Sequence, residues 1–198
     1  MTSPFVLPRT RVLAVAVAAA LLALVASQLV AQHPAGNAGA ASAGTVHISM
    51  TVHGKHQGNF KGDNLTGRAA SDLINVFSYQ YSVTSPRDLA SGQASGKRQH
   101  HPVVITHELG ASSPQFFEAV VTNELLDKVV VNFFKTQANG KEVNFYRVTL
   151  TNASVSEFKQ YSSGPTVLED ISFTFQKIEQ RSFAQNTDFI ADLSNAGA

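Results

Sequence analysis

The chain has 198 residues, of which 43% are apolar and 15% are charged, and this length suits one globular domain better than two. Fifteen Lys and Arg nearly balance fourteen Asp and Glu, and both signs are scattered along the chain. The charge pattern therefore gives no reason to expect nucleic-acid binding. Cysteine is absent, which excludes disulfide scaffolds, thiolate metal sites and cysteine nucleophiles.

The first 31 residues differ in composition from the rest of the chain. Arg9 and Arg11 precede an uncharged run of Val, Leu and Ala over residues 12–26, and residues 29–31 extend it. A basic start followed by about 7–15 apolar residues is typical of an export signal. Residues 1–31 are therefore predicted to be a signal peptide, or an uncleaved signal anchor if the full run provides the ~20 residues that cross a bilayer.

This segment also predicts the location of the protein. Residues 32–44 are rich in Ala and Gly and predict a flexible linker that leads into the patterned domain. We expect a secreted or periplasmic protein. The alternatives are an inner-membrane protein held by the uncleaved N-terminal segment, or a cytoplasmic protein before secretion if the start is misassigned.

The region from residue 45 to residue 181 begins with two segments of alternating apolar and polar residues. Residues 45–52 alternate strictly and predict a half-buried strand. Residues 73–84 alternate again, which predicts one strand with Phe77 and Val83 on its apolar face. Residues 85–101 are small and polar without periodicity, so they predict a long excursion between strands.

One helix is expected after a short strand at residues 103–106. Ser112 and Ser113 before Pro114 predict its start, because serine is a good N-cap and proline suits the first turn. The apolar residues that follow at helical spacing predict one buried face: Phe116, Phe117, Val120 and Val121.

The second half of the region predicts further strands. Residues 127–136 are apolar on both faces, so both faces need cover. Asn139-Gly140 favours a type I′ hairpin turn, because both residues tolerate positive φ. The other predicted strands are 141–151, 154–160 and 167–178, and residues 182–198 form an extension without pattern. About seven strands and one short flanking helix, without a βαβ rhythm, predict a mainly β fold, an antiparallel barrel or sandwich.

Five segments in this order resemble a known family. They are SGKRQHHPVVIT at 95–106, SPQFFEA at 113–119, TNE at 122–124, LTNASV at 150–155 and VLEDISFTFQKIE at 167–179. Together they resemble the haemolysin-coregulated protein (Hcp) family, the tube protein of type VI secretion. The resemblance covers residues 44–180 and implies a β-barrel protomer with one flanking helix, which forms hexameric rings that stack into a hollow tube.

The same resemblance implies partners but no catalysis. Copies of the chain would be the main partners, and small effectors inside the tube or other secretion-system proteins are further candidates. The chain departs from the family in its export signal, since the family's tube subunits assemble in the cytoplasm. An exported monomeric module or secreted effector, which uses the same β fold to bind a partner, therefore remains the alternative.

Two groups of residues are predicted to carry assembly. Lys97, Arg98, His100 and His101 lie in or beside the long excursion and are candidates for contacts between rings. Val129, Val131, Phe133 and Phe134 belong to the strand that is apolar on both faces and are candidates for a subunit interface.

No active site, cofactor site or metal site is expected. His53 and His56 lack the i, i+4 spacing of a helical zinc motif. The chain contains no Gly-x-Ser-x-Gly, Walker or dinucleotide motif. Glu169 and Asp170 are adjacent in a predicted strand, so their carboxylates point to opposite faces. An enzyme that uses the histidines is the weakest of the hypotheses.

Overall fold

The computed structural model describes residues 45–63 and 72–194. The predicted signal segment 1–31 and the predicted linker 32–44 lie outside these residues. None of the helices within the described ranges is long and apolar enough to cross a membrane.

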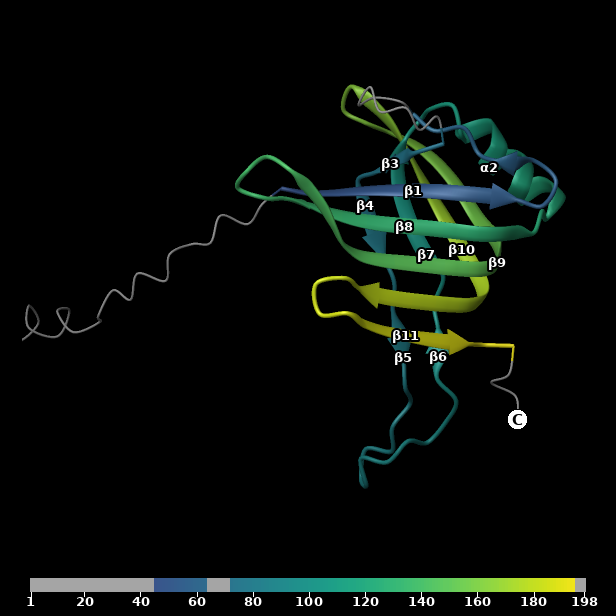
Figure 1. Ribbon diagram of the computed structural model, residues 1–198. Coiled ribbons are helices and arrows are strands. Elements are labelled where there is room, and N and C mark those ends of the chain that lie inside the picture. Colours follow the sequence, from purple (N-terminus) through teal and green to yellow (C-terminus); the bar gives the residue numbers. More distant parts are fainter. Residues whose placement is uncertain (1–44, 64–71, 195–198) are drawn as a thin grey trace, which may run out of the picture. The chain divides into compact units, whose positions relative to one another are not determined.

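One helix and eleven strands form in the described residues (Figure 1). In chain order they are β1 (Val46–Gly54), β2 (Gly58–Asn59), β3 (Ile74–Val76), β4 (Ser78–Gln80), β5 (Val83–Thr84), β6 (Gln99–His100), β7 (Val103–Glu108), α2 (Ser113–Thr122), β8 (Leu126–Thr136), β9 (Glu142–Ser163), β10 (Thr166–Ser182) and β11 (Thr187–Asp192). The predicted mainly β fold with one short helix is confirmed.

Antiparallel pairing closes most of these strands into a barrel. The main sheet has the order β2-β1-β8-β9-β10-β7-β4. β3 pairs with β1, and β4, which follows one residue later, pairs with β7. The chain from β3 to β4 therefore connects the two ends of the sheet, and the Phe77 N–H donates to Thr106 O at the crossing point.

Alternate residues of these strands fill the interior, as the period of two in β1 predicted. The fully buried core includes Met50, Ile74, Val103, Ile105, Phe116, Leu126, Val129, Val131, Leu150, Ile171 and Phe173. Burial of a large apolar side chain contributes about 1.5–3 kcal/mol, so this core is the main source of stability in a chain without disulfides.

Residues 73–84, predicted as one strand, instead form β3, β4 and β5. The partner changes from β1 to β7 at Phe77, so the alternation does not continue through this point. Phe77 is 58% exposed and Val83 is also exposed, whereas Ile74 and Val76 are buried. The predicted apolar face was wrong for Phe77 and Val83.

Helix α2 begins after Ser112, as predicted, although the Ser112 side chain makes no capping hydrogen bond. Phe116 and Ala119 face the barrel and are fully buried. Phe117 is 57% exposed and Val121 is 63% exposed, so the predicted buried face was wrong for these two residues. The helix therefore carries a second apolar stripe that nothing in the described part of the chain covers fully.

One turn and the tail also differ from the predictions. Gly140 has φ +77°, but Asn139 is not in the positive-φ region, and the Gly140 N–H donates to Gln137 O. This geometry fits a three-residue loop and not a type I′ turn. The tail from residue 182, predicted to lack pattern, contains β11 at Thr187–Asp192, which pairs with the second half of β10.

Candidate assembly surfaces

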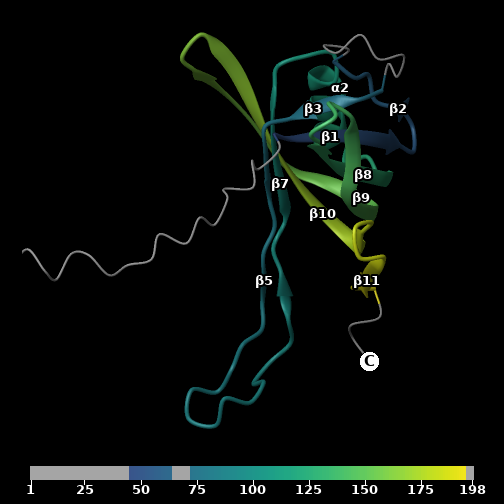
Figure 2. The same cartoon turned by 60° about the vertical axis from the view of Figure 1, so that its left-hand side comes forward.

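The long excursion is an ordered two-stranded arm, defined here as residues 83–100 from β5 through β6. Val83 pairs with His100, and farther out Arg87 bridges to Ala94. Figure 2 shows the arm extending away from the barrel. Residues 87–99 are all exposed, and Leu89 is fully exposed.

A capped turn stabilises the end of the arm. The Asp88 carboxylate accepts hydrogen bonds from the N–H groups of Ser91 at 2.7 Å and Ala90 at 3.1 Å. The bond from the Ser91 backbone is the largest cause of the lowered pKa of Asp88. Asp88 thus holds the turn at the end of the arm as a carboxylate.

The root of the arm is attached to the barrel by an aromatic cluster. The Tyr81 hydroxyl and His100 Nδ1 are 2.6 Å apart, and both rings contact Phe175 of β10. His101 Nε2 lies 3.3 Å from the Thr84 hydroxyl. Of the four residues predicted for ring contacts, Lys97, Arg98 and His101 are exposed, whereas His100 is half-buried and holds the root.

The four residues predicted for a subunit interface separate into two pairs. Val129 and Val131 are fully buried in the chain's own core, so their side chains offer no surface to a partner. Phe133 packs on Tyr79 and Tyr146 and is half-buried, as is Phe134, whose ring stacks on His47. The interface prediction therefore loses Val129 and Val131, because residues of the same barrel already cover both.

The outer stripe of α2 is an exposed apolar surface that the sequence did not predict. Phe117 contacts Phe158 of β9, with ring centroids 5.7 Å apart, and Val121 follows one turn later. Their spacing of four residues places both on one side of the helix. The sequence did contain a sign of this stripe. Phe116-Phe117 and Val120-Val121 are two adjacent apolar pairs, and the members of such pairs cannot all lie on one side of a short helix.

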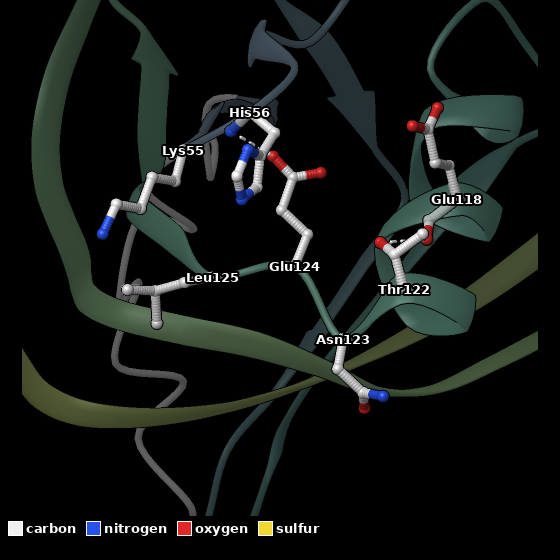
Figure 3. Close-up of a pocket in the computed structure, with 7 residues that line it drawn as sticks. All are labelled: Lys55, His56, Glu118, Thr122, Asn123, Glu124 and Leu125. Carbon is white, nitrogen blue, oxygen red and sulfur yellow. Dashed lines mark hydrogen bonds between the residues drawn. The ribbon is translucent and has the colours of Figure 1, made fainter.

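The segment Thr122-Asn123-Glu124 ends α2 and ties it to the turn after β1 (Figure 3). Asn123 has φ +52° and ends the helix in the left-handed region. Glu124 Oε1 accepts the N–H groups of His56 at 2.8 Å and Gln57 at 2.9 Å, and Oε2 accepts Gln57 Nε2 at 2.7 Å. The carboxylate therefore replaces an ordinary backbone acceptor for this turn.

Glu124 lies against an open cavity of about 550 Å³, and Lys55, His56 and Glu118 also line it. Glu124 is only 4% exposed. Burial by itself raises its pKa, but the hydrogen bonds from Gln57 and His56 outweigh burial and bring the pKa below the usual value for glutamate. These contacts occupy the carboxylate, so Glu124 acts here as a structural link between α2 and the turn after β1.

A buried pair lies between β7, β10 and α2. His107 Nε2 is 3.2 Å from Glu169 Oε2, both residues are fully buried, and the two atoms are not aligned for a hydrogen bond. Burial lowers the pKa of His107, against the opposing effect of the Glu169 charge. Gln160 Nε2 donates to the other oxygen of Glu169 at 2.6 Å. Residues 45–63 and 72–194 contain no group of three or more potential metal ligands.

Comparison with known proteins agrees with this architecture. A model of the family described as "Type VI secretion system effector, Hcp" matches residues 34–181. The "Major exported protein" of Pseudomonas aeruginosa is 35% identical over 115 residues, which cover 54% of this chain and 67% of that protein.

Solved structures show the same fold. A crystal structure of an Hcp protein has a TM-score of 0.69 at 25% identity and covers 74% of this chain and 98% of its own. The secreted protein Hcp3 from Pseudomonas aeruginosa has a TM-score of 0.64 at 26% identity, with coverages of 75% and 98%.

The antiparallel barrel with one short helix has the fold of the Hcp structures. The chain belongs to the Hcp family of the type VI secretion system. Proteins of this family are secreted through that system, typically form hexamers and are not enzymes.

Proposed function

We propose that this chain forms hexameric rings and that the arm joins successive rings into a tube. The arm carries the proposal, because its hairpin is ordered by its own hydrogen bonds while residues 87–99 are all exposed. An ordered and solvated extension of this length needs a function outside the protomer. The hexamer is the usual assembly of the family.

Charge indicates where the arm would bind. Arg87, Lys97 and Arg98 give it an excess of positive charge over Asp88. β7 runs away from the arm root, and five steps of about 3.3 Å place Glu108 roughly 17 Å along the strand from its start. The end of the barrel opposite the arm therefore carries an acidic residue, followed by the exposed Leu109.

Asp63 adds to this acidic end, since its carboxylate accepts the Ala111 N–H just after β7. The fully exposed Leu89 of the arm and Leu109 give the two surfaces matching apolar groups. Each exposed ion pair contributes only about 0–1 kcal/mol, but a closed ring repeats the contact in every protomer. Stacking of rings in one direction follows from these two different ends.

The contact within a ring is proposed to use the outer stripe of α2, Phe117 and Val121, with Phe133 and Phe134 as further candidates. An apolar patch at the surface of a monomer indicates an interface. The partner is another copy of the chain, and it would remove this stripe from water.

A charge reversal tests the stacking step separately from ring formation. The variant Lys97→Glu with Arg98→Glu should form rings but no stacks, as judged by light scattering after size-exclusion chromatography and by negative-stain microscopy. Lys141→Glu, in the exposed β8–β9 turn, is the matched control and should stack like the unchanged chain. A strictly monomeric chain at micromolar concentration would contradict ring formation, and stacks that persist after both reversals would contradict the role of the arm.

The alternative is an exported monomeric module or secreted effector that uses the same fold to bind a partner. The sequence of residues 1–31 favours it, because Arg9 and Arg11 precede an apolar run that is typical of an export signal. In that case the protein is secreted or periplasmic, or stays on the inner membrane through an uncleaved segment. N-terminal sequencing of the native protein decides whether the segment is removed, and light scattering decides between monomer and ring.

A further inference from the structure

β11 (Thr187–Asp192) is an edge strand. Among residues 45–63 and 72–194 it pairs with β10 alone, and Figure 1 shows it at the lower end of the sheet. The family match ends at residue 181, so β11 is an addition to the matched region. Its central residues are apolar and exposed, Phe189 by 68% and Ile190 by 44%. Such an edge is a template for another strand.

The hydrogen bonds to β10 show which backbone groups of β11 remain available. The Leu193 N–H donates to Gln176 O at 2.7 Å, in register with the β10–β11 pairs. Successive residues of a strand direct their N–H and C=O groups to opposite sides. The odd-numbered residues therefore face β10, and Asp188, Ile190 and Asp192 direct their backbone groups outward.

A second copy of β11 can meet this edge antiparallel, about a two-fold axis, only in a few registers. An axis at Asp188 would place Asp188 opposite Asp188 of the second copy. An axis at Ile190 would place Asp188 opposite Asp192 of the second copy. Like charges directly opposite are destabilising, so charge disfavours both registers.

A two-fold axis at Phe189 pairs the outward backbone groups of the two copies and places no acid opposite another acid. Asp188 then lies opposite Ile190 of the second copy, and the two Phe189 side chains meet in a close pair without backbone bonds between them. An axis at Ala191 also separates the acids, but it overlaps fewer residues of β11, which ends at Asp192.

The charge of β11 does not oppose this contact. Asp188 lies across from Arg181 in the β10–β11 register, and Asp192 lies across from Lys177. Each acidic residue of the edge thus has a basic cross-strand neighbour within its own chain. Opposite charges in such positions stabilise the β10–β11 pair, and in the Phe189 register no acid lies directly opposite another acid.

We propose that β11 is a contact between two copies of this chain, joined edge to edge about a two-fold axis at Phe189. This goes beyond the proposed ring and tube, because a two-fold contact between identical edges is a different symmetry element from the rotation that closes a ring. It joins the sheets of two protomers into one and covers the exposed phenylalanine.

The chain lacks cysteine, so one introduced cysteine reports on contacts between copies only. The full-length chain with Phe189→Cys, expressed in cells and oxidised with copper phenanthroline, should give a disulfide dimer on a non-reducing gel. The matched control is Ile190→Cys on the same exposed strand, which lies opposite Asp188 of the second copy. We expect at least about fivefold more dimer from Phe189→Cys, because only the directly opposed pair has disulfide geometry.

A second variant separates this contact from chance collision. Adding Ile190→Pro to Phe189→Cys removes an outward N–H without loss of a β10 bond, and the dimer should fall several-fold. Equal crosslinking of the two cysteine variants, or a Phe189→Cys chain that stays monomeric on the gel, would overturn the proposal. Light scattering on the same variants shows whether hexamers form, so failure of this contact and failure of the ring are distinguishable.

Discussion

Replacement of Glu124 by alanine is the most direct test of the joint between α2 and the turn after β1. The change removes both acceptors of this turn and leaves the N–H groups of His56 and Gln57 without their partner. A buried polar group that loses its partner costs about 1–3 kcal/mol. The adjoining cavity is open and admits water to the site, so we expect a loss of about 2–4 kcal/mol for the two groups together.

Thermal unfolding followed by circular dichroism measures this loss. For a domain of this size 1 kcal/mol shifts Tm by about 2–4 °C, so Glu124→Ala should lower Tm by roughly 5–15 °C. Glu124→Gln keeps one carbonyl oxygen but places its amide beside Gln57 Nε2, and its Tm should be intermediate. Glu118→Ala, exposed on the same cavity, should change stability by no more than about 0.5 kcal/mol. A Glu124→Ala protein as stable as the Glu118→Ala control would refute the reasoning.

Three other changes test different parts of the molecule. Gly54→Ala would place a Cβ 2.5 Å from Glu124 Oε1 and should destabilise by about 1–3 kcal/mol in urea unfolding, whereas Gly96→Ala meets only ordinary contacts and should be neutral. Burial lowers the pKa of His107 in the folded chain, so below about pH 6.5 the unfolded chain binds more protons than the folded chain. The free energy of unfolding should therefore fall with decreasing pH more steeply in the unchanged chain than in His107→Gln. Equal slopes for the two proteins would exclude His107 as the cause. Phe117→Ser should shift hexamers toward monomers in light scattering with little change in Tm, and an unchanged hexamer would exclude the α2 stripe from the ring.

The sequence predicted those elements whose pattern continues over several residues. The alternation of residues 45–52 correctly predicted strand β1, with Met50 and Val52 buried, although Val46 is exposed and Ser49 is buried. The serine-proline start of α2 also corresponds to the structure. The strand at 73–84 was wrong because its partner changes at Phe77, and a change of partner leaves no mark in the alternation. β11 was missed because neither of its faces is buried, so its sequence has no apolar period to detect.

The assembly surfaces were harder to predict than the fold. The apolar residues on both faces of β8 indicated a subunit interface, but Val129 and Val131 are covered within the same barrel. Apolar character shows that a side chain needs cover, but it does not show whether that cover comes from the same chain or from a partner. The role of Glu124 depends on residues more than sixty positions earlier in the chain, which no local pattern shows. The arm was predicted as a long excursion. The Asp88 turn at its end is local, but its root is held by contacts of Tyr81 and His100 with Phe175, which lies far along the chain.

The pairing of β1 with β8 affects how the chain folds as it is made. β1 emerges near the start of the domain, but its main partner comes only after β7 and α2. β9 and β10, in contrast, are joined by a short turn and can pair as soon as both are available. Local pairs form faster than distant ones, so the β9–β10 hairpin should form early and the pairing of β1 with β8 should form later. During synthesis or export, the edge of β1 that pairs with β8 must therefore wait, open to aggregation or chaperones, until β8 has followed, although β2 and β3 can already pair with its other edge.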